Sequence, residues 1–334
     1  MERQQLAKWW KKENGGIRCH LCPWECFIKE NETGICKVRR NISNNLYSLV
    51  YGKPVAMNID PIEKKPLYHF LPGTSSFSIG TFGCNMQCKF CQNWDISQRD
   101  MENLEFEIDY YSPTEIIDLV MKNNCRSIAF TYNEPTIFGE YVIDIAKLAK
   151  KNNIETIMVT NGYILPEARS EIYKYIDAAN IDIKGFTEKF YKSFTGGSLK
   201  NVLDTIVYLK SKNIHIEVTT LLINGENDDA NNLKKEFSWI NNMLGSDIPL
   251  HLSAFHPAYK MKDQEMTTLP SMQNAYRIAK KSGLKFVYLG NVVNADNNTY
   301  CPNCGKMIIN RSGYSTKIKQ INKCKCGEKI PIIF

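Results

Sequence analysis

One stretch of the sequence decides the fold: Phe77-Ser78-Ile79-Gly80-Thr81-Phe82-Gly83-Cys84-Asn85-Met86-Gln87-Cys88-Lys89-Phe90-Cys91. Its first five residues favour a β-strand, and a loop with three cysteines follows directly. Cys84, Cys88 and Cys91 lie close enough in sequence to bind three irons of one cubane iron–sulfur cluster, for which thiolate is the usual ligand. The loop carries no fourth cysteine, so one iron would stay open, and an open metal position is where chemistry can happen.

Around this loop, short β-rich runs alternate with amphipathic patterns, which indicates βα units and a parallel sheet. Strands are expected at 77–81, 127–132, 155–160, 178–184, 214–223, 250–255 and 285–289. Helices are expected from Ser112 onward and at about 138–152, 166–176, 198–213, 229–243 and 271–283. Ser112 and Glu115 are spaced to form a capping box. Six such units predict an α/β fold, a partial (β/α)6 TIM barrel that stops short of the closed eightfold form.

Polar residues follow six successive strands near the point where each strand ends. The cysteine loop follows the first strand, and the later strands supply Asn133-Glu134, Thr160-Asn161, Asp182 with Lys184, Thr219-Thr220, and His256. In such barrels, ligand-handling residues lie at the carboxyl ends of the strands. We therefore expect these side chains to share one rim. Each has a structural alternative: an N-cap for Glu134, a turn at Asn161, a surface pair for Asp182 and Lys184, and a structural role for His256.

The spacing C-x3-C-x2-C, with an aromatic residue before the last cysteine, is identified as the signature of the radical S-adenosylmethionine (radical SAM) superfamily. Other stretches resemble the pyruvate formate-lyase activating enzyme group, and most closely the radical SAM enzymes of the AmmeMemoRadiSam system. These stretches are 74–97, 130–136, 159–162, 182–185, 21–23, 34–39 and 255–257. The resemblance covers nearly the whole chain.

The resemblance implies an oxidoreductase that works without oxygen. A [4Fe–4S] cluster on Cys84, Cys88 and Cys91 would reductively cleave S-adenosylmethionine to a 5′-deoxyadenosyl radical, which would abstract a hydrogen from a substrate. The implied cofactor contacts are Phe90 on the adenine, Glu134 at the methionine ammonium, Thr160 and Asn161 at the ribose, Lys184 at the methionine carboxylate, and His256 at the cofactor or substrate. Asn133 and Asp182 are implied as further cofactor contacts. A zinc site is the alternative for the loop, but structural zinc takes four ligands.

Two further cysteine groups flank the central region, so that the chain divides into 1–75, 76–293 and 294–334. The N-terminal group, Cys19, Cys22, Cys26 and Cys36, can saturate either one zinc or iron ion or an auxiliary [4Fe–4S] cluster. We favour the single ion. The C-terminal group, Cys301, Cys304, Cys324 and Cys326, brackets a hairpin pattern at 308–318 and predicts a zinc ribbon. Iron in a rubredoxin-like site is the alternative there.

Composition narrows the function classes. Twelve cysteines in dense groups argue against a disulfide framework and for a reducing compartment. No apolar run approaches the ~18 residues that a membrane helix needs. Residues 1–14 also lack the apolar core of a secretion signal, so we expect a cytoplasmic protein without membrane contact. The net charge of +7 counts every cysteine as neutral, and metal-bound thiolates would offset much of it.

The substrate is less defined than the chemistry. A protein is favoured, through a glycine Cα–H of a partner enzyme or another side chain, with an electron donor such as ferredoxin or flavodoxin. RNA is the second candidate substrate, and the C-terminal tail would then bind it. The tail, however, lacks a dense Arg/Lys patch interleaved with aromatic residues. A small-molecule substrate is the third alternative. An alternative function, outside the enzymes, is that of an iron–sulfur electron-transfer protein. Such a protein would need a fully ligated cluster at Cys84.

Overall fold

The computed structural model describes residues 5–99, 107–320 and 323–334. Within these residues, the centre of the molecule is an eight-stranded sheet in the order β14-β13-β12-β11-β10-β9-β8-β7. Neighbouring strands from β8 to β14 are parallel, whereas β7 is antiparallel to β8. The strands are β7 (Ala56–Pro61), β8 (Ser75–Gly80), β9 (Ser127–Phe130), β10 (Glu155–Thr160), β11 (Ala178–Ile183), β12 (His215–Leu222), β13 (Leu250–Ala254) and β14 (Val287–Gly290).

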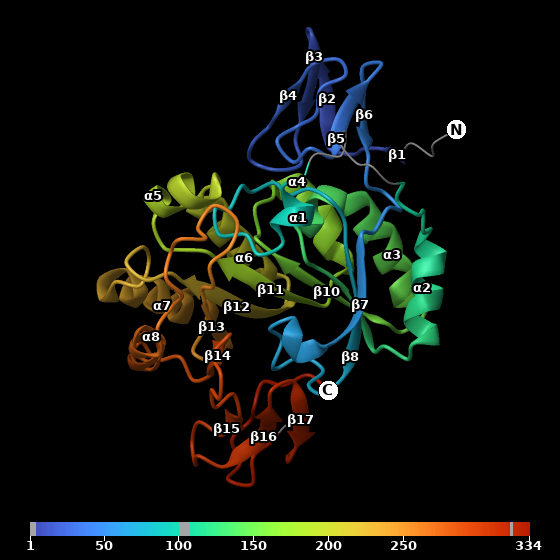
Figure 1. Cartoon of the computed structure of the whole chain (residues 1–334). Helices are drawn as coiled ribbons and strands as arrows, with labels where there is room; N and C mark the ends of the chain where they lie inside the picture. Colours follow the sequence, from blue (N-terminus) through green and yellow to red (C-terminus); the bar gives the residue numbers. More distant parts are fainter. Residues whose placement is uncertain (1–4, 100–106, 321–322) are drawn as a thin grey trace.

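Helices connect the parallel strands and lie outside the curved sheet (Figure 1). They are α1 (Trp94–Ser97), α2 (Pro113–Lys122), α3 (Gly139–Lys151), α4 (Pro166–Ile172), α5 (Glu188–Phe190), α6 (Leu199–Ser211), α7 (Ala230–Leu244) and α8 (Leu269–Lys281). Each of the longer helices buries one apolar face, as Ile116, Ile117 and Val120 do on α2. The expected partial (β/α)6 barrel is confirmed. The capping box is present too, since Ser112 and Glu115 each accept the other's backbone N–H.

Strand β7 was not predicted. It lies within the segment 1–75, so the sheet extends further toward the N-terminus than residue 76, while the division of the chain into domains stays a prediction. The register pairs Ala56 with Gly80 and Pro61 with Ser75 along the whole of β8. Because β7 occupies an edge, its terminal proline can be accommodated there.

An N-terminal module precedes β7 and consists, in the described chain, of two small antiparallel sheets. Their strands are β1 (Gln5–Leu6), β5 (Arg39–Ile42) and β6 (Asn45–Ser48), and β2 (Trp10–Glu13), β3 (Gly16–Cys19) and β4 (Phe27–Ile28). A buried ion pair fastens the module to α3, with Arg39 donating to both carboxylate oxygens of Glu140 at 2.9 and 3.1 Å. Breaking one partner of such a buried pair is strongly destabilising, so the module is a fixed part of the molecule.

The C-terminal tail forms an antiparallel sheet of β15 (Thr299–Tyr300), β16 (Met307–Ser312) and β17 (Ser315–Ile318). The hairpin predicted around Gly313 is therefore confirmed. Figure 1 places the tail at the bottom and the N-terminal module at the top, at opposite ends of the barrel. The tail packs on Tyr68, Phe286 and Tyr288 through a separate apolar cluster.

A buried polar network lies inside the sheet, near the amino ends of β12 and β13. The Glu217 carboxylate accepts the backbone N–H groups of Tyr68 and His69, at 2.9 and 2.6 Å, and contacts the rings of His215 and His251. The opposite end of the barrel carries the cysteine loop. Among the described residues, no helix is long and apolar enough to cross a membrane.

Candidate active site

The cysteine loop leaves β8 through a turn that requires glycine. Gly83 has φ +88°, and a Cβ on it would lie 2.5 Å from the carbonyl oxygen of Cys36. Asn133 holds the same turn, because its Nδ2 donates to the Gly83 carbonyl at 2.8 Å and its Oδ1 accepts from Thr81 N at 3.1 Å. Asn133 thus supports the start of the loop from the end of β9.

The three loop cysteines lie close together but not within reach of one ion. Cys88 is buried, and Cys84 and Cys91 are half-buried. No three metal-ligating atoms of this loop lie within 4.8 Å of one another, a condition that only the tail cysteines meet among the described residues. Four irons and four sulfides separate the thiolates of a cubane, which need this wider spacing. The donor set therefore fits three corners of a [4Fe–4S] cluster.

Burial disfavours the thiolate forms of Cys84 and Cys88. It raises the pKa of Cys88 to about 12, against the opposing effect of the Lys184 ammonium. Burial and then the Glu134 charge raise the pKa of Cys84 well above its usual range. Metal binding must therefore displace protons from these thiols. The positive charge of Lys184, which is about 19 % exposed and pairs with Asp182 at 2.7 Å, favours the thiolate of Cys88.

Glu134 is the N-cap of a 3-10 turn (Pro135–Phe138) and at the same time holds the end of β10. Its Oε1 accepts from Thr136 N at 3.0 Å and from Thr160 Oγ1 at 2.7 Å. Its Oε2 accepts from Asn161 N at 2.8 Å. The carboxylate is 2 % exposed, and burial raises its pKa. Glu134 thus has the N-cap role that was the structural alternative to cofactor binding. Any contact with a cofactor would have to coexist with that role.

Asn161 links this network to the cysteine loop. Its Nδ2 donates to Asn85 Oδ1 at 2.9 Å and lies 3.9 Å from Cys84 Sγ. Its Oδ1 accepts from Tyr163 N, which closes the turn after β10. The structure therefore joins Glu134, Asn161 and the cysteine loop in one hydrogen-bonded unit.

Two further expected cofactor contacts have other neighbours, Phe90 within the cysteine loop and His256 after β13. Phe90 is 4 % exposed and packs beside Phe190, with ring centroids 6.3 Å apart. His256 lies after β13 and contacts the Asn291 carbonyl at 3.4 Å. A role for either residue at the cofactor stays a prediction.

Other residues at this rim were missed from the sequence. Tyr132 has φ +71°, a strained conformation for a residue with a side chain. Its hydroxyl donates to Asp60 at 2.6 Å, and its carbonyl accepts from Asn93 at 2.6 Å. No sequence pattern signals a left-handed tyrosine; it is set by contacts with β7, where Asp60 lies, and with the cysteine loop.

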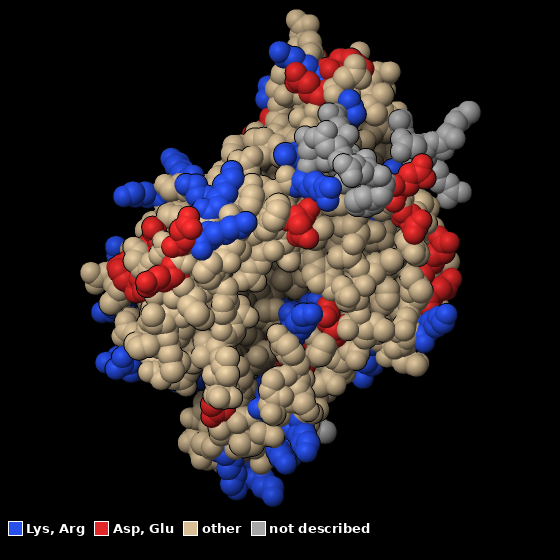
Figure 2. All heavy atoms as spheres, in the orientation of Figure 1, with Lys and Arg blue, Asp and Glu red and all other residues tan. Residues whose placement is uncertain are grey.

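A second missed feature is an aromatic stack beside the cysteine loop. Trp94 and Tyr259 stack at 5.6 Å, and Trp94 is partly exposed. Lys260 N donates to the Lys89 carbonyl at 2.9 Å, so the segment after β13 touches the loop. Figure 2 shows a hollow near the middle of the face presented, with charged side chains of both signs at its edge.

The tail cysteines form a compact tetrad. Sγ of Cys301 lies 3.6 Å from Sγ of Cys326, and Sγ of Cys304 lies 3.5 Å from Sγ of Cys324. All four sulfur atoms lie within 4.8 Å of one another. A tetrahedral site with Zn–S bonds of about 2.3 Å has sulfurs roughly 3.8 Å apart. The tetrad fits one tetrahedral ion.

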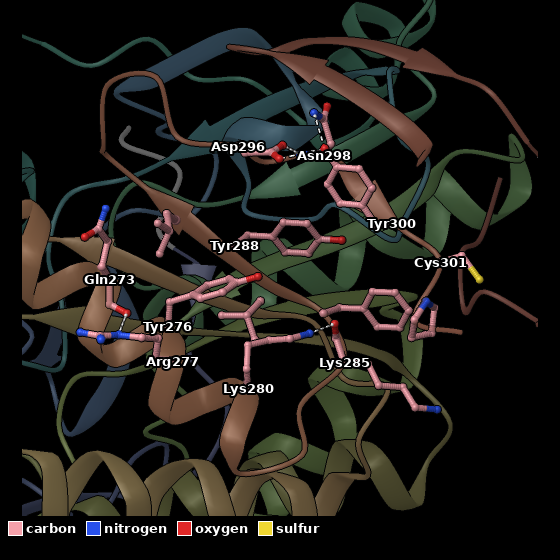
Figure 3. A pocket seen from close by; sticks show the side chains of 14 residues that line it. Gln273, Tyr276, Arg277, Lys280, Lys285, Tyr288, Asp296, Asn298, Tyr300 and Cys301 are labelled. Atoms are coloured by element: carbon pink, nitrogen blue, oxygen red, sulfur yellow. Dashed lines mark hydrogen bonds between the residues drawn. The ribbon is translucent and has the colours of Figure 1, made fainter. Parts of the chain in front are cut away.

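The cavity in Figure 3 lies elsewhere, between α8, β14 and the tail, and has a volume of about 670 Å³. Tyr276, Tyr288 and Tyr300 line it together with Arg277 and Lys280. Of the site residues expected from the sequence, Cys301 alone is among those that line it. The cavity is therefore distinct from the cysteine loop.

Comparisons with known proteins agree with this geometry. The model of the radical SAM superfamily matches residues 78–235. An uncharacterized protein of Methanocaldococcus jannaschii is 41 % identical over 329 residues, 97 % of each chain. The pyruvate formate-lyase 1-activating enzyme of Escherichia coli is 23 % identical over 188 residues, 54 % of this chain and 74 % of that enzyme. The crystal structure of Streptococcus suis SuiB bound to S-adenosylmethionine shares the fold, with TM-score 0.50 and 11 % identity, over 70 % of this chain and 53 % of SuiB.

The chain belongs to the radical SAM superfamily. Within it, the chain falls in the group that is similar to the pyruvate formate-lyase activating enzymes. It is thus an enzyme of the radical SAM type, a class that uses a [4Fe–4S] cluster and S-adenosylmethionine for radical chemistry.

Proposed function

We propose that this enzyme holds its catalytic cluster on Cys84, Cys88 and Cys91 and directs radical chemistry at a protein substrate. The observation that carries the proposal is a loop of three buried or half-buried thiols, spaced for a cubane and hydrogen-bonded to a polar rim. When bound, the cluster would supply the electron that cleaves S-adenosylmethionine, and the 5′-deoxyadenosyl radical would abstract a hydrogen from the substrate.

The residues of the rim would bind and orient the cofactor. Glu134 fixes Thr160 and Asn161 through hydrogen bonds, so a ribose hydroxyl would meet groups already in place. Lys184 lies near Cys88 and offers a partly exposed cation to the methionine carboxylate. We propose Asn133, Asp182, Phe90 and His256 as supporting contacts from the same rim.

A protein substrate is supported by the named relatives and by the open barrel. The relatives include activating enzymes for pyruvate formate-lyase and for 4-hydroxyphenylacetate decarboxylase. In the part of the chain that the structure describes, β7 and β14 are the two edges of the sheet, and the barrel does not close on itself. Such an opening could admit a loop of a partner protein. A one-electron donor such as ferredoxin or flavodoxin is the expected second partner.

RNA is less well supported at this site. Lys and Arg side chains do gather on the tail, at the bottom of Figure 2. The tail, however, lies at the end of the barrel opposite the N-terminal module and the cysteine loop (Figure 1). We propose that the tail instead carries a structural zinc ion on its cysteine tetrad.

The catalytic proposal is tested by reducing the anaerobically purified enzyme with dithionite in the presence of S-adenosylmethionine. We expect 5′-deoxyadenosine from the native chain and none from Cys88→Ala. Cys125→Ala is the matched control, because Cys125 is a buried cysteine outside the three groups. If Cys88→Ala still forms 5′-deoxyadenosine, the cluster is not where we place it.

The substrate class is tested by adding fractions of cell extract to the reduced enzyme. We expect a fraction that increases 5′-deoxyadenosine formation and loses this effect after protease treatment. Electron paramagnetic resonance of that fraction would show whether a glycyl radical forms. Sensitivity to ribonuclease instead of protease would favour RNA and overturn the protein substrate.

A further inference from the structure

The four cysteines of the N-terminal module line one partly enclosed space beside the cysteine loop. Cys19, Cys22 and Cys36 are buried and Cys26 is half-buried. The rest of the lining is mainly apolar, from Leu21, Trp24, Ile28, Ile35 and Ile137. Segments on both sides of β4 supply the sulfurs, so the cavity is made by the fold of the module.

The spacing of these thiols differs from that of the tail tetrad. The tail brings four sulfurs within 4.8 Å of one another, as a single tetrahedral ion requires. Throughout the described chain no other three cysteine, histidine or acidic ligand atoms meet that limit, so the N-terminal thiols stand wider apart. They share this property with Cys84, Cys88 and Cys91, and a cubane needs it.

Two neighbours of the cavity fit a bulky, negatively charged group. Arg39 lines the cavity, is 1 % exposed, and leaves its Nε without a hydrogen-bond partner among the described residues. An unpaired buried N–H is costly unless a ligand satisfies it. Gly34 has no positive φ that would require glycine, yet a Cβ there would lie 3.5 Å from Cys26 Sγ and occupy space beside that thiol.

We infer that Cys19, Cys22, Cys26 and Cys36 hold a second [4Fe–4S] cluster, fully ligated by protein, with the Arg39 guanidinium beside it. Wide thiol spacing, rather than the number of cysteines, distinguishes this site from a single zinc or iron ion. The sequence alone favoured a single ion at these four cysteines, and because of the thiol spacing we propose a cluster there instead. The inference does not depend on the substrate of the enzyme.

The second cluster lies against the catalytic loop. The Cys36 carbonyl is packed so closely on Gly83, the residue before Cys84, that a Cβ there would be 2.5 Å away. Trp24, another residue of the cavity, donates its indole N–H to the Asn85 carbonyl at 2.7 Å. This contact places the second cluster to receive one electron from a ferredoxin- or flavodoxin-type donor and pass it to the catalytic cluster. No bond forms or breaks in that step.

Elemental analysis of the full chain, purified anaerobically, is the first test. We expect about eight irons and eight sulfides per chain, with about one zinc in the tail. About four irons with two zincs, or about five irons with four sulfides, would mean a single ion in the N-terminal module and would overturn the inference.

The second test removes the catalytic cluster alone with the triple variant Cys84→Ala, Cys88→Ala and Cys91→Ala. About four irons should remain, with the Mössbauer spectrum of a cubane and an electron paramagnetic resonance signal that S-adenosylmethionine does not alter. Absence of that cubane overturns the inference. Retention of all the iron would instead contradict the catalytic assignment, so the two failures are distinguishable.

The electron path is tested with Cys22→Ser. We expect the ratio of flavodoxin-driven to dithionite-driven 5′-deoxyadenosine formation to fall at least tenfold below that of the native chain. An unchanged ratio in a variant that has lost about four irons would overturn the path while leaving the second cluster in place.

Discussion

Glu134 shows how one buried carboxylate can order the end of a neighbouring strand. Its oxygens accept hydrogen bonds from both the backbone of Asn161 and the side chain of Thr160, so one residue after β9 holds the end of β10. Hydrogen bonds to a charged acceptor are stronger than neutral ones, but here they offset only part of the cost of burial, because the pKa of Glu134 is still raised. The residue is thus an N-cap and a positioning group together.

Glu134→Gln should therefore weaken cofactor binding more than it weakens the fold. A glutamine accepts at one atom only, and its NH2 group would face the N–H of Asn161 or of Thr136. We expect the KM for S-adenosylmethionine to rise about tenfold and the stability to fall by about 2 kcal/mol. Thr160→Ser, which keeps the hydroxyl, is the control. A loss of stability with an unchanged KM would leave Glu134 as an N-cap only.

At the scale of elements, α7 packs on β12 through a carboxyl group that has no cationic partner among its described contacts. Glu236 is buried and accepts a hydrogen bond from Thr220 on β12. Burial raises the pKa of Glu236 to about 8. The carboxyl group is therefore protonated in the folded protein at neutral pH, whereas in the unfolded chain it is ionised.

This difference predicts a pH-dependent stability. The folded pKa lies above the unfolded value, so the contribution of Glu236 is fully present below about pH 4.5 and is lost as the pH rises toward 8. Glu236→Gln stays neutral and should be more stable than the native chain at pH 8, by roughly 3 kcal/mol, with little difference near pH 5. Thermal unfolding at both pH values measures this, with the exposed Glu226→Gln as the control for net charge. An equal gain at both pH values would contradict it.

The capping box of α2 gives a second prediction at this scale. Ser112 Oγ accepts the N–H of Glu115, which has no partner within the first turn of the helix. Ser112→Ala should cost about 1 kcal/mol of stability, whereas Ser112→Thr, which can still cap, should cost less. Thermal unfolding of the two variants measures the difference. Equal stability of Ser112→Ala and the native chain would show that the Glu115 side chain alone suffices.

At the scale of the whole molecule, the two ends of the barrel have different tasks. The N-terminal module contacts the cysteine loop, whereas the tail covers the other end. Arg311 of the tail is buried and donates to the Tyr68 carbonyl at 2.7 Å. Thr316 donates to Glu63 at 2.6 Å, so the tail is attached by polar as well as apolar contacts.

Cys304→Ser should separate these tasks. We expect the variant to lose about one zinc per chain, because a structural site takes four ligands. Its Tm should also fall, because metal supplies much of the folding energy of so small a module. Iron content should not change. Loss of iron together with zinc would show that the tail and the catalytic loop fold as one unit.

Most of the barrel could be predicted from sequence because its signals are local. Strand alternation, helix periodicity and the Ser112 capping box each depend on residues near one another in the chain. Strand β7 was missed, because it pairs antiparallel with β8 and only a short 3-10 helix, Ile62–Lys64, lies between them, so the pattern of alternating strands and long helices does not reveal it. The left-handed backbone conformation of Tyr132 could not be predicted either, because its hydrogen-bond partner Asp60 lies 72 residues away in the sequence.

The sequence by itself determined the class of the enzyme and predicted where its catalytic loop lies, because three cysteines at fixed spacing lie within eight residues of one another. Only the tertiary structure decided how far apart the sulfurs of each group lie. It also decided which groups Glu134 holds, and which end of the barrel each cysteine module covers. Such distances depend on how segments remote in sequence pack together, and local sequence patterns do not predict that packing.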